Sequence, residues 1–291
     1  MTALGNFLVN ATALSSLYAI LAIGFTLVFG VGRVLNFAHA AFITIGAYAA
    51  YQVSNPNAWG LHVWFGFLAA VLVTALVGAV VYRTAIRYVD PQSTVGMILT
   101  MAVAFFILFA IRAIYGDFGI AVPTPAPGIG AVAGVEVQYH LVLAFAVSWL
   151  AIAFLLAFVN HTDTGTAIVA TSMNVRGARL AGIDTDRVNL YTWTVAAGLA
   201  GAGGMLLAGF QGGGWFMGIE PLVLSFAIVV LGGLGSIKGS VVGAHVIGFL
   251  ETAVVSFVDP ALGGMASLVV LVVVLLVRPS GLWGHTLMEG R

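Results

Sequence analysis

Long uncharged intervals, separated by short polar clusters, dominate the pattern of this chain. A bilayer-crossing helix needs roughly 20 mostly apolar residues, and most intervals between the charged residues approach or exceed this length. They predict membrane-spanning helices over residues 7–30, 37–53, 62–82, 91–111, 139–159, 188–210, 221–235, 240–257 and 262–277. The predicted count is eight or nine, because the two short pieces flanking residues 235–239 are either half-helices or full spans.

Two connecting segments differ from the apolar intervals. Residues 116–138 contain Pro123, Pro125, Pro127 and several glycines, which favour an extended loop over a helix. Residues 160–187 hold 6 of the 20 Lys, Arg, Asp and Glu residues of the chain. We interpret residues 1–291 as one transmembrane domain that carries both loops.

Composition assigns the chain to the integral membrane proteins. Hydrophobic residues make up 61%, charged residues only 7%, and the mean hydropathy is +1.11. A soluble domain needs about a quarter of its residues charged to cover its surface. A net charge of zero gives no argument for nucleic-acid binding. The absence of cysteine excludes disulfides, thiol nucleophiles and Cys-ligated metal sites.

The basic residues predict the orientation in the membrane, because Lys and Arg favour the cytoplasmic side. Placing the 160–187 segment inside leaves only Arg112 near the outer face. The basic residues then inside are Arg33, Arg83, Arg87, Arg176, Arg179, Arg187, Lys238, Arg278 and Arg291. This predicts a multi-pass protein of the inner or plasma membrane with an external N-terminus, an external 116–138 loop and a cytoplasmic C-terminus.

No motif for catalysis, nucleotide or metal is convincing. Residues 235–240 are rich in Gly and Ser, but the lysine precedes the glycine, whereas a phosphate loop needs Gly-Lys followed by Ser or Thr. The six histidines lack metal-ligand spacing, and spacing localises no His/Ser/Asp set. We therefore expect a chain that is not an enzyme and binds no metal or cofactor itself.

Polar residues inside the predicted spans are few. Glu251 is the only acid well inside a span, on one helix face with Ser240, Ala244 and Gly248. It is either a structural hydrogen-bonding group between helices or part of a permeation path or gate. Asn36 and His39 begin the second span, either as capping and interfacial residues or as candidates for the same path.

Glycines cluster near the later break in the pattern. Gly232, Gly233 and Gly235 let helices approach closely or unwind, and close helix packing is the default interpretation in a membrane bundle. The later half of the chain weakly repeats a pattern of the earlier half: a Gly-rich break is followed by a basic residue and then by a histidine, Arg33 and His39 in one case and Lys238 and His245 in the other. Interrupted helices at corresponding places in two halves are typical of transporters.

The 160–187 segment predicts a short helix outside the membrane. Residues 162–166 offer N-cap candidates, a helix is expected over 167–181, and Gly182 is placed as the C′ residue. Val169, Met173 and Leu180 share one side of this helix. Such a helix either rests in the lipid headgroups or docks into a groove of a cytosolic partner.

Four stretches together resemble the branched-chain amino acid ABC transporter permeases of the LivH/LivM type: residues 34–48, 178–187, 231–251 and 278–284. The resemblance implies an all-α ABC importer permease bundle with a cytosolic coupling helix. It implies a second related permease subunit as a heterodimer or homodimer, two cytosolic ATPase subunits that bind ATP, and an external solute-binding protein. The 160–187 segment would be the ATPase-coupling loop, with contact residues Thr166, Met173, Asn174, Arg176, Arg179 and Gly182.

This chain departs from the family pattern in the coupling loop. Val169-Ala170 and Met173-Asn174 stand where the family usually carries an Arg-Ala pair and then acids, and Lys238-Gly239 replaces a Pro-Gly pair. The resemblance leaves several substrates open: branched-chain amino acids, other amino acids, amides or urea. The alternative function is a self-sufficient channel or ion-coupled carrier for a small polar solute, in which Glu251 and the broken helices supply the coupling site.

Overall fold

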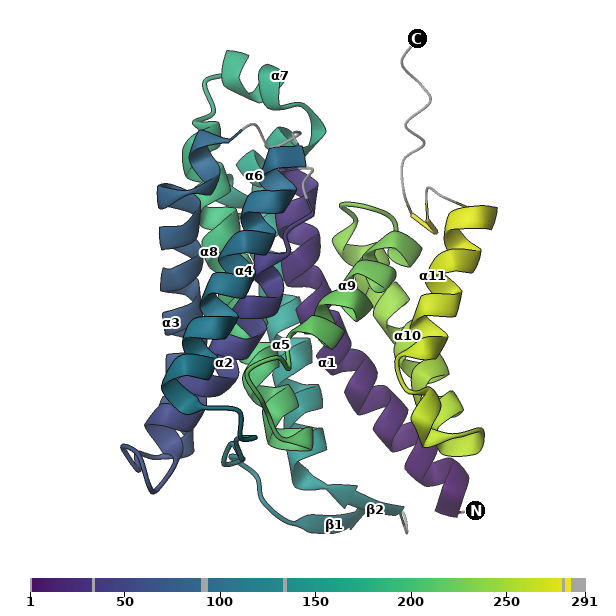
Figure 1. The fold of residues 1–291 in the computed structure, drawn as a ribbon. Helices are drawn as coiled ribbons and strands as arrows, with labels where there is room; N and C mark the ends of the chain where they lie inside the picture. Colours follow the sequence, from purple (N-terminus) through teal and green to yellow (C-terminus); the bar gives the residue numbers. More distant parts are fainter. Residues whose placement is uncertain (1, 33–34, 90–93, 133–134, 279–280, 284–291) are drawn as a thin grey trace.

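A bundle of antiparallel helices forms most of the molecule (Figure 1). The structure is a computed structural model, and it describes residues 2–32, 35–89, 94–132, 135–278 and 281–283. Its helices are α1 (Thr2–Gly32), α2 (Ala38–Ser54), α3 (Val63–Thr84), η1 (Ile86–Tyr88), α4 (Thr94–Tyr115), α5 (Tyr139–His161), α6 (Asp163–Met173), α7 (Val175–Leu180), α8 (Thr185–Gln211), α9 (Ile219–Gly232), α10 (Ile237–Phe257), η2 (Pro260–Leu262) and α11 (Met265–Val277).

Six helices of the described residues are long and apolar enough to cross a bilayer: α1, α3, α4, α5, α8 and α10. The predicted piece over 240–257 corresponds to α10, which has 21 residues. The predicted piece over 221–235 corresponds to α9, whose 14 residues span about 21 Å and fall short of a hydrocarbon core of about 30 Å. The predicted start of the fourth span at residue 91 lies outside the described residues.

α1 and α8 occupy the centre of the bundle, and α3, α4 and α5 lie at its periphery. Most of α1 and α8 is buried, whereas the outer helices expose rows of large apolar side chains such as Leu76, Phe106 and Leu150. This distribution is expected for helices that face lipid, because lipid tails solvate apolar side chains as well as a protein core does.

Glycines bring the central helices into backbone contact. A Cβ added to Gly46 of α2 would lie 2.3 Å from the carbonyl oxygen of Gly201 on α8. A Cβ added to Gly201 would lie 2.3 Å from the carbonyl oxygen of Ala70 on α3. Only glycine permits these approaches, and α8 therefore packs tightly between α2 and α3.

A small β-hairpin, which the sequence did not predict, interrupts the loop over 116–138. Strands β1 (Ile129–Val132) and β2 (Val135–Gln138) pair antiparallel, with Ile129 opposite Gln138. A separate antiparallel bridge joins Ile120 to Gly213 in the connection between α8 and α9. The prediction that this segment is not helical is confirmed. Its backbone forms hydrogen bonds in the hairpin and in the bridge to Gly213.

Charged residues divide between the two ends of the bundle. Arg83, Arg87, Lys238 and Arg278 lie at the end where α1 and α11 finish and where α7 is found, together with the basic residues of the 160–187 segment (Figure 1). The opposite end carries the hairpin and Arg112, with the acids Asp117, Glu136 and Asp259. Glu220, in the first turn of α9, lies between the two ends, because the nearby Gly218 N–H donates to Thr44 within α2 (Figure 1). Arg33 and Arg291, which we assigned to the basic end, lie outside the described residues.

Candidate functional site

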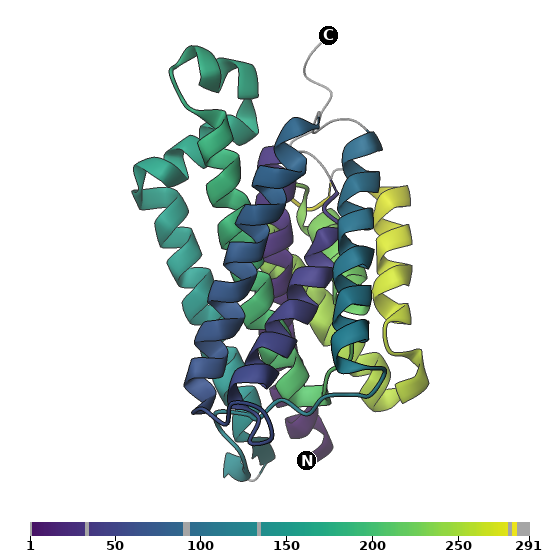
Figure 2. The same cartoon turned by 60° about the vertical axis from the view of Figure 1, so that its left-hand side comes forward.

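The α6–α7 segment, residues 163–180, lies at the end of the bundle, and its α7 part projects beyond the ends of the neighbouring helices (Figure 2). α6 packs on the last turns of α5, and α7 stands farther from the bundle in both views (Figures 1 and 2). The most polar stretch of the sequence therefore forms a protrusion at the basic end of the molecule.

Local sequence explains where α6 begins. Thr162 caps the helix, because its side chain accepts a hydrogen bond from the Gly165 N–H at 3.0 Å. A Cβ added to Gly165 would lie 2.3 Å from the carbonyl oxygen of Phe158 on α5. Gly165 thus lets α6 turn closely against the end of α5.

Asn174 divides the predicted helix over 167–181 into two helices, and the prediction of one continuous helix was wrong. Asn174 has an extended backbone with φ −155° and ψ 104°, and it ends α6 as its C-cap. Its side chain also accepts a hydrogen bond from the Gly177 N–H at 2.8 Å, which caps the start of α7. A short amide side chain can bond to a nearby backbone N–H group, and this bond replaces a hydrogen bond of a continuous helix.

Gly182 ends α7 as the sequence predicts. Its φ of +85° is a left-handed conformation that favours glycine. The Gly182 N–H donates to the Arg179 carbonyl and the Ile183 N–H donates to the Ala178 carbonyl, both at 3.0 Å. These two bonds form a Schellman motif, which turns the chain sharply toward α8.

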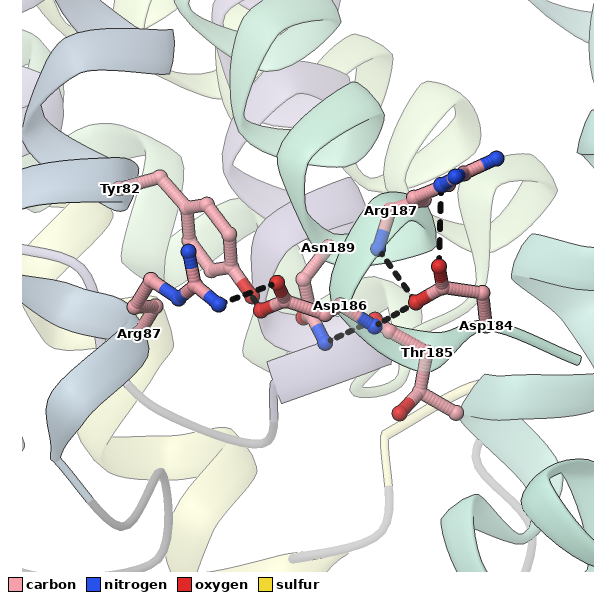
Figure 3. A network of polar contacts seen from close by, with 7 residues as sticks. All are labelled: Tyr82, Arg87, Asp184, Thr185, Asp186, Arg187 and Asn189. Carbon is pink, nitrogen blue, oxygen red and sulfur yellow. Dashed lines mark hydrogen bonds and ion pairs between the residues drawn. The ribbon is translucent and has the colours of Figure 1, made fainter.

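A polar network surrounds the first turn of α8 (Figure 3). Asp184 caps the helix by accepting from the N–H groups of Asp186 and Arg187, each at 3.2 Å. The Arg187 guanidinium forms an ion pair with Asp184 at 3.0 Å, and the Asn189 side-chain amide donates to the Thr185 carbonyl at 2.8 Å. These contacts lie within the start of one helix.

Two further contacts of this network leave α8. The Tyr82 hydroxyl at the end of α3 donates to Asp186 Oδ1 at 2.7 Å. The Arg87 guanidinium on η1 forms an ion pair with Asp186 Oδ2 at 3.2 Å (Figure 3). On the other side, Arg179 Nε of α7 donates to Thr185 Oγ1 at 2.9 Å. The start of α8 is therefore bonded to both α7 and the α3–η1 corner.

A pocket of about 130 Å³ lies behind this network. Val28, Gly32 and Trp193 line its apolar side, and Tyr82 and Asp186 line its polar side. A second, more polar pocket of about 420 Å³ opens beside Arg83, Arg87, Asp184, Asp186 and Arg187. The two pockets therefore flank the contact between Asp186 and the end of α3.

The predicted coupling residues lie on the exposed side of the α6–α7 segment. Thr166, Met173, Asn174, Arg176, Arg179 and Gly182 are all exposed. Arg179 and Asn174 form the bonds given above, whereas Arg176 has no hydrogen bond or ion pair within the described residues. Met173 and Leu180 expose 75% and 82% of their surface, so the described part of the chain leaves most of both apolar side chains accessible.

Asn36 and His39 lie buried beside α1. Asn36 Oδ1 accepts from the Ala38 N–H at 3.0 Å at the start of α2, and Asn36 Nδ2 has no partner among the described residues. His39 Nε2 donates to the Leu21 carbonyl at 3.0 Å, while its Nδ1 finds no partner in the part of the chain that the structure describes. His39 also contacts the Phe25 ring edge-on at 5.6 Å. Both side chains make local or interhelical bonds that hold α2 against α1.

Glu251 is also buried, on the helix face that the sequence predicts. Ser240, Ala244 and Gly248 of the same face are buried with it. Its Oε1 accepts a hydrogen bond from the Gly264 N–H at the start of α11, and its Oε2 has no partner within the described ranges. The carboxylate therefore links α10 to α11, and it lies at a helix N-terminus, where negative charge is favoured.

The three glycines of the later break have different environments. Gly232 contacts Gly239 so closely that a Cβ added to Gly232 would lie 2.3 Å from the Gly239 carbonyl oxygen. Gly233 and Gly235 instead adopt φ values of +103° and +83° in the turn between α9 and α10. Gly232 is thus placed for helix packing, and the other two form the turn.

Sequence reasoning missed the contact of Tyr82 and Arg87 with Asp186. Tyr82 and Asp186 are 104 positions apart, and no spacing rule relates them. Tyr82 at the end of a span resembles an ordinary interfacial aromatic residue. Within the described residues, no group of three or more His, Cys, Asp or Glu could hold a metal ion.

Comparison with known proteins identifies the family. Residues 7–277 match the family described as branched-chain amino acid transport system / permease component. The high-affinity branched-chain amino acid transport system permease protein LivH of Salmonella typhimurium is 29% identical over 96% of this chain and 95% of its own length. The corresponding BraD of Pseudomonas aeruginosa is 29% identical over 97% and 96%.

A solved structure, PsaBC from Streptococcus pneumoniae in complex with Fab, matches with a TM-score of 0.51 at 13% identity. The match covers 94% of this chain and 92% of that chain, and it supports the fold alone. The family match, by contrast, extends over nearly every described helix and includes the α6–α7 segment and the α8 network. The chain therefore belongs to the family of branched-chain amino acid transport system permease components.

Proposed function

We propose that this chain is the membrane-spanning permease subunit of an ABC importer that carries branched-chain amino acids across the inner or plasma membrane. The family match over residues 7–277 is the observation that carries this proposal. LivH and BraD are named as permease proteins of high-affinity branched-chain amino acid transport systems. In this proposal residues 1–291 form one permease domain that binds no cofactor and catalyses no reaction, and partner chains hydrolyse ATP.

The proposed orientation places the α7 end in the cytosol. Basic residues gather at that end, and the opposite end carries three acids and Arg112. This asymmetry supports a cytosolic α6–α7 segment, an external N-terminus and an external β-hairpin. The C-terminus would then be cytosolic.

The proposed docking partner of the α6–α7 segment is a cytosolic ATPase subunit. The segment projects beyond the bundle, which supports a protein partner over burial in headgroups (Figure 2). Its surface combines the exposed apolar side chains Met173 and Leu180 with the cation Arg176. Exposed apolar patches with a polar rim are typical of interaction surfaces. Asn174, which stands where the family usually has charge, would act by shaping the bend between α6 and α7.

The remaining proposed partners follow from the same function. An importer needs two permease subunits to enclose a path, and the second would be a related chain or a second copy of this one. Two ATPase subunits would bind the cytosolic side, and a solute-binding protein would deliver the amino acid to the hairpin end. Asn36, His39 and Glu251 remain candidates for the path or gate, although each already has a bonding partner in this chain.

Copurification tests the proposed docking surface. The double variant Met173→Asp with Leu180→Asp places charge on the apolar side of the segment, and we expect tagged protein to retain about tenfold less ATPase than the wild type. The matched control is Phe118→Asp, because Phe118 is 85% exposed at the opposite end of the molecule. Unchanged ATPase retention by the double variant, or equal loss in the control, would contradict docking at this segment.

A further inference from the structure

Three side chains join the start of α8 to the end of α3, and we call them the clasp: Tyr82, Arg87 and Asp186 (Figure 3). We propose that the clasp transmits movement of the α6–α7 segment to α3, and that Asp186 is its positioning residue. The proposal rests on the proposed function, but it concerns a contact inside this chain and not the contact with the ATPase.

One side of the clasp leads to α7. Arg179 of α7 donates to the buried hydroxyl of Thr185 at 2.9 Å, and Asp186 is the next residue of α8. The two hydrogen bonds of the Schellman motif close the intervening turn at Gly182. Because α7 and the first turn of α8 are bonded in this way, displacement of α7 moves the Asp186 carboxylate.

The other side of the clasp leads to α3 and η1. Asp186 uses one oxygen for the Tyr82 hydroxyl at 2.7 Å and the other for the Arg87 guanidinium at 3.2 Å. Tyr82 belongs to the last turn of α3, and Arg87 belongs to η1, the turn that follows. A single carboxylate therefore holds both parts of this corner against α8.

The surroundings favour a contact that opens and closes. The Arg87 and Asp186 side chains are 37% and 49% exposed, and ion pairs at such exposure add little net stability. The pocket of about 130 Å³ lies between the clasp and Val28, Gly32 and Trp193. This unfilled space leaves room for the Tyr82, Arg87 and Asp186 side chains to separate, while the α3 and α8 backbones stay packed against each other.

The same turn of α8 offers a matched control. Arg187 pairs with Asp184 at 3.0 Å, but both residues belong to the start of α8. Replacing Arg187 by Gln removes an exposed arginine–carboxylate pair of the same kind and leaves every bond of the clasp in place. If uptake per ATP depends only on surface charge near α8, the Arg187→Gln variant should lose it as well. If uptake per ATP depends on the link to α3, this variant should keep it.

The test measures leucine uptake and ATP hydrolysis in the same vesicles, with the complete complex reconstituted from this chain and its partners. Asp186→Asn keeps the size of the side chain and an acceptor for Tyr82 but removes the charge, and Arg87→Gln removes the cation. We expect about fivefold less leucine moved per ATP in both variants. We expect no change in Arg187→Gln, and melting temperatures close to the wild type in all three.

Wild-type uptake per ATP in both clasp variants would overturn the clasp while leaving the proposed function intact. An equal loss in Arg187→Gln would likewise overturn it. If the wild-type complex itself shows no ATP-dependent uptake, the proposed function fails and the clasp proposal fails with it.

Spin labels give a readout that does not depend on transport. The chain contains no cysteine, and Leu180→Cys with Thr84→Cys therefore places one label on α7 and one at the end of α3, both at exposed positions. The distance is measured on the labelled chain without its partners, because Leu180 belongs to the proposed ATPase-docking surface. We expect a narrow distance distribution in the otherwise unchanged protein and a broad one with Asp186→Asn. Equal widths in the two proteins would contradict a mechanical link through Asp186.

Discussion

Glu251 shows how a buried charge is accommodated between two helices of this bundle. Its Oε1 accepts a hydrogen bond from the backbone N–H of Gly264, and none of the described residues bonds its Oε2. In Glu251→Gln the amide oxygen can keep this bond, and we expect a loss of under about 1 kcal/mol in stability and near-normal transport. Glu251→Ala leaves the Gly264 N–H without an acceptor, which should cost about 1–3 kcal/mol. Thermal unfolding in detergent and uptake assays measure both effects.

Loss of transport in Glu251→Gln, at normal expression and melting temperature, would instead show that the negative charge itself serves the path. The sequence placed Glu251 on a buried face, because Ser240, Ala244 and Gly248 follow helical spacing. It could not identify Gly264 as the partner, since this contact depends on how the chain turns between α10 and α11.

Asp117 offers a test by pH at the hairpin end. The Arg112 guanidinium donates two hydrogen bonds to this carboxylate, at 2.5 and 2.9 Å, and lowers the pKa of Asp117 below its usual value. A lowered pKa in the folded state means that the pair stabilises the protein above the unfolded pKa of about 3.9 and loses this effect as pH falls further. We expect Asp117→Asn to have a lower melting temperature from about pH 5 to 8, with a difference that shrinks below about pH 4.

A melting-temperature difference that disappears already between pH 7 and pH 5 would contradict this pairing. Arg112→Gln should give the same pH profile, because it removes the other half of the pair. The Arg112 guanidinium also lies 5.0 Å from the centroid of the Trp215 ring, and the Arg112 variant should therefore show the larger loss at neutral pH.

Close contact between α9 and α10 depends on Gly232. A Cβ added there would lie 2.3 Å from the Gly239 carbonyl oxygen, and neither backbone can yield without separating the helices. We expect Gly232→Ala to destabilise the protein by about 1–3 kcal/mol, measured as a lower melting temperature in detergent. The control is Gly198→Ala in α8, where an added Cβ would meet its nearest neighbours at an ordinary 3.6 Å. Equal stability of the two variants would show that α9 and α10 are not packed this tightly.

Most helices could be predicted from the sequence, because long uncharged intervals have few alternatives in a membrane. The division of the 160–187 segment into two helices could not be predicted. A single asparagine does not by itself indicate a helix break, and the hydrogen bond from the Gly177 N–H to Asn174 is seen only in the structure. The β-hairpin was missed for a similar reason. Its strands have four residues each and depend on pairing with each other, whereas the prolines nearby indicated only an extended chain.

The chain as a whole combines a family fold with a polar junction that joins its protruding segment to the bundle. The family resemblance is confirmed by the match over residues 7–277, which includes three of the four sequence stretches. The junction itself, from Arg179 through Asp186 to Arg87, brings together residues of α7, α8 and η1 and could not be predicted from spacing. The proposed orientation in the membrane is inferred from the distribution of charge, and the proposed partners are inferred from the family. A transport assay tests the proposed partners.

The most direct measurement is leucine uptake into vesicles that contain this chain, with the partner subunits and ATP added or omitted one at a time. We predict saturable uptake only when the second permease, the ATPase subunits, the solute-binding protein and ATP are all present. Saturable leucine flux through this chain alone, without ATP, would contradict an ABC importer and favour a self-sufficient carrier.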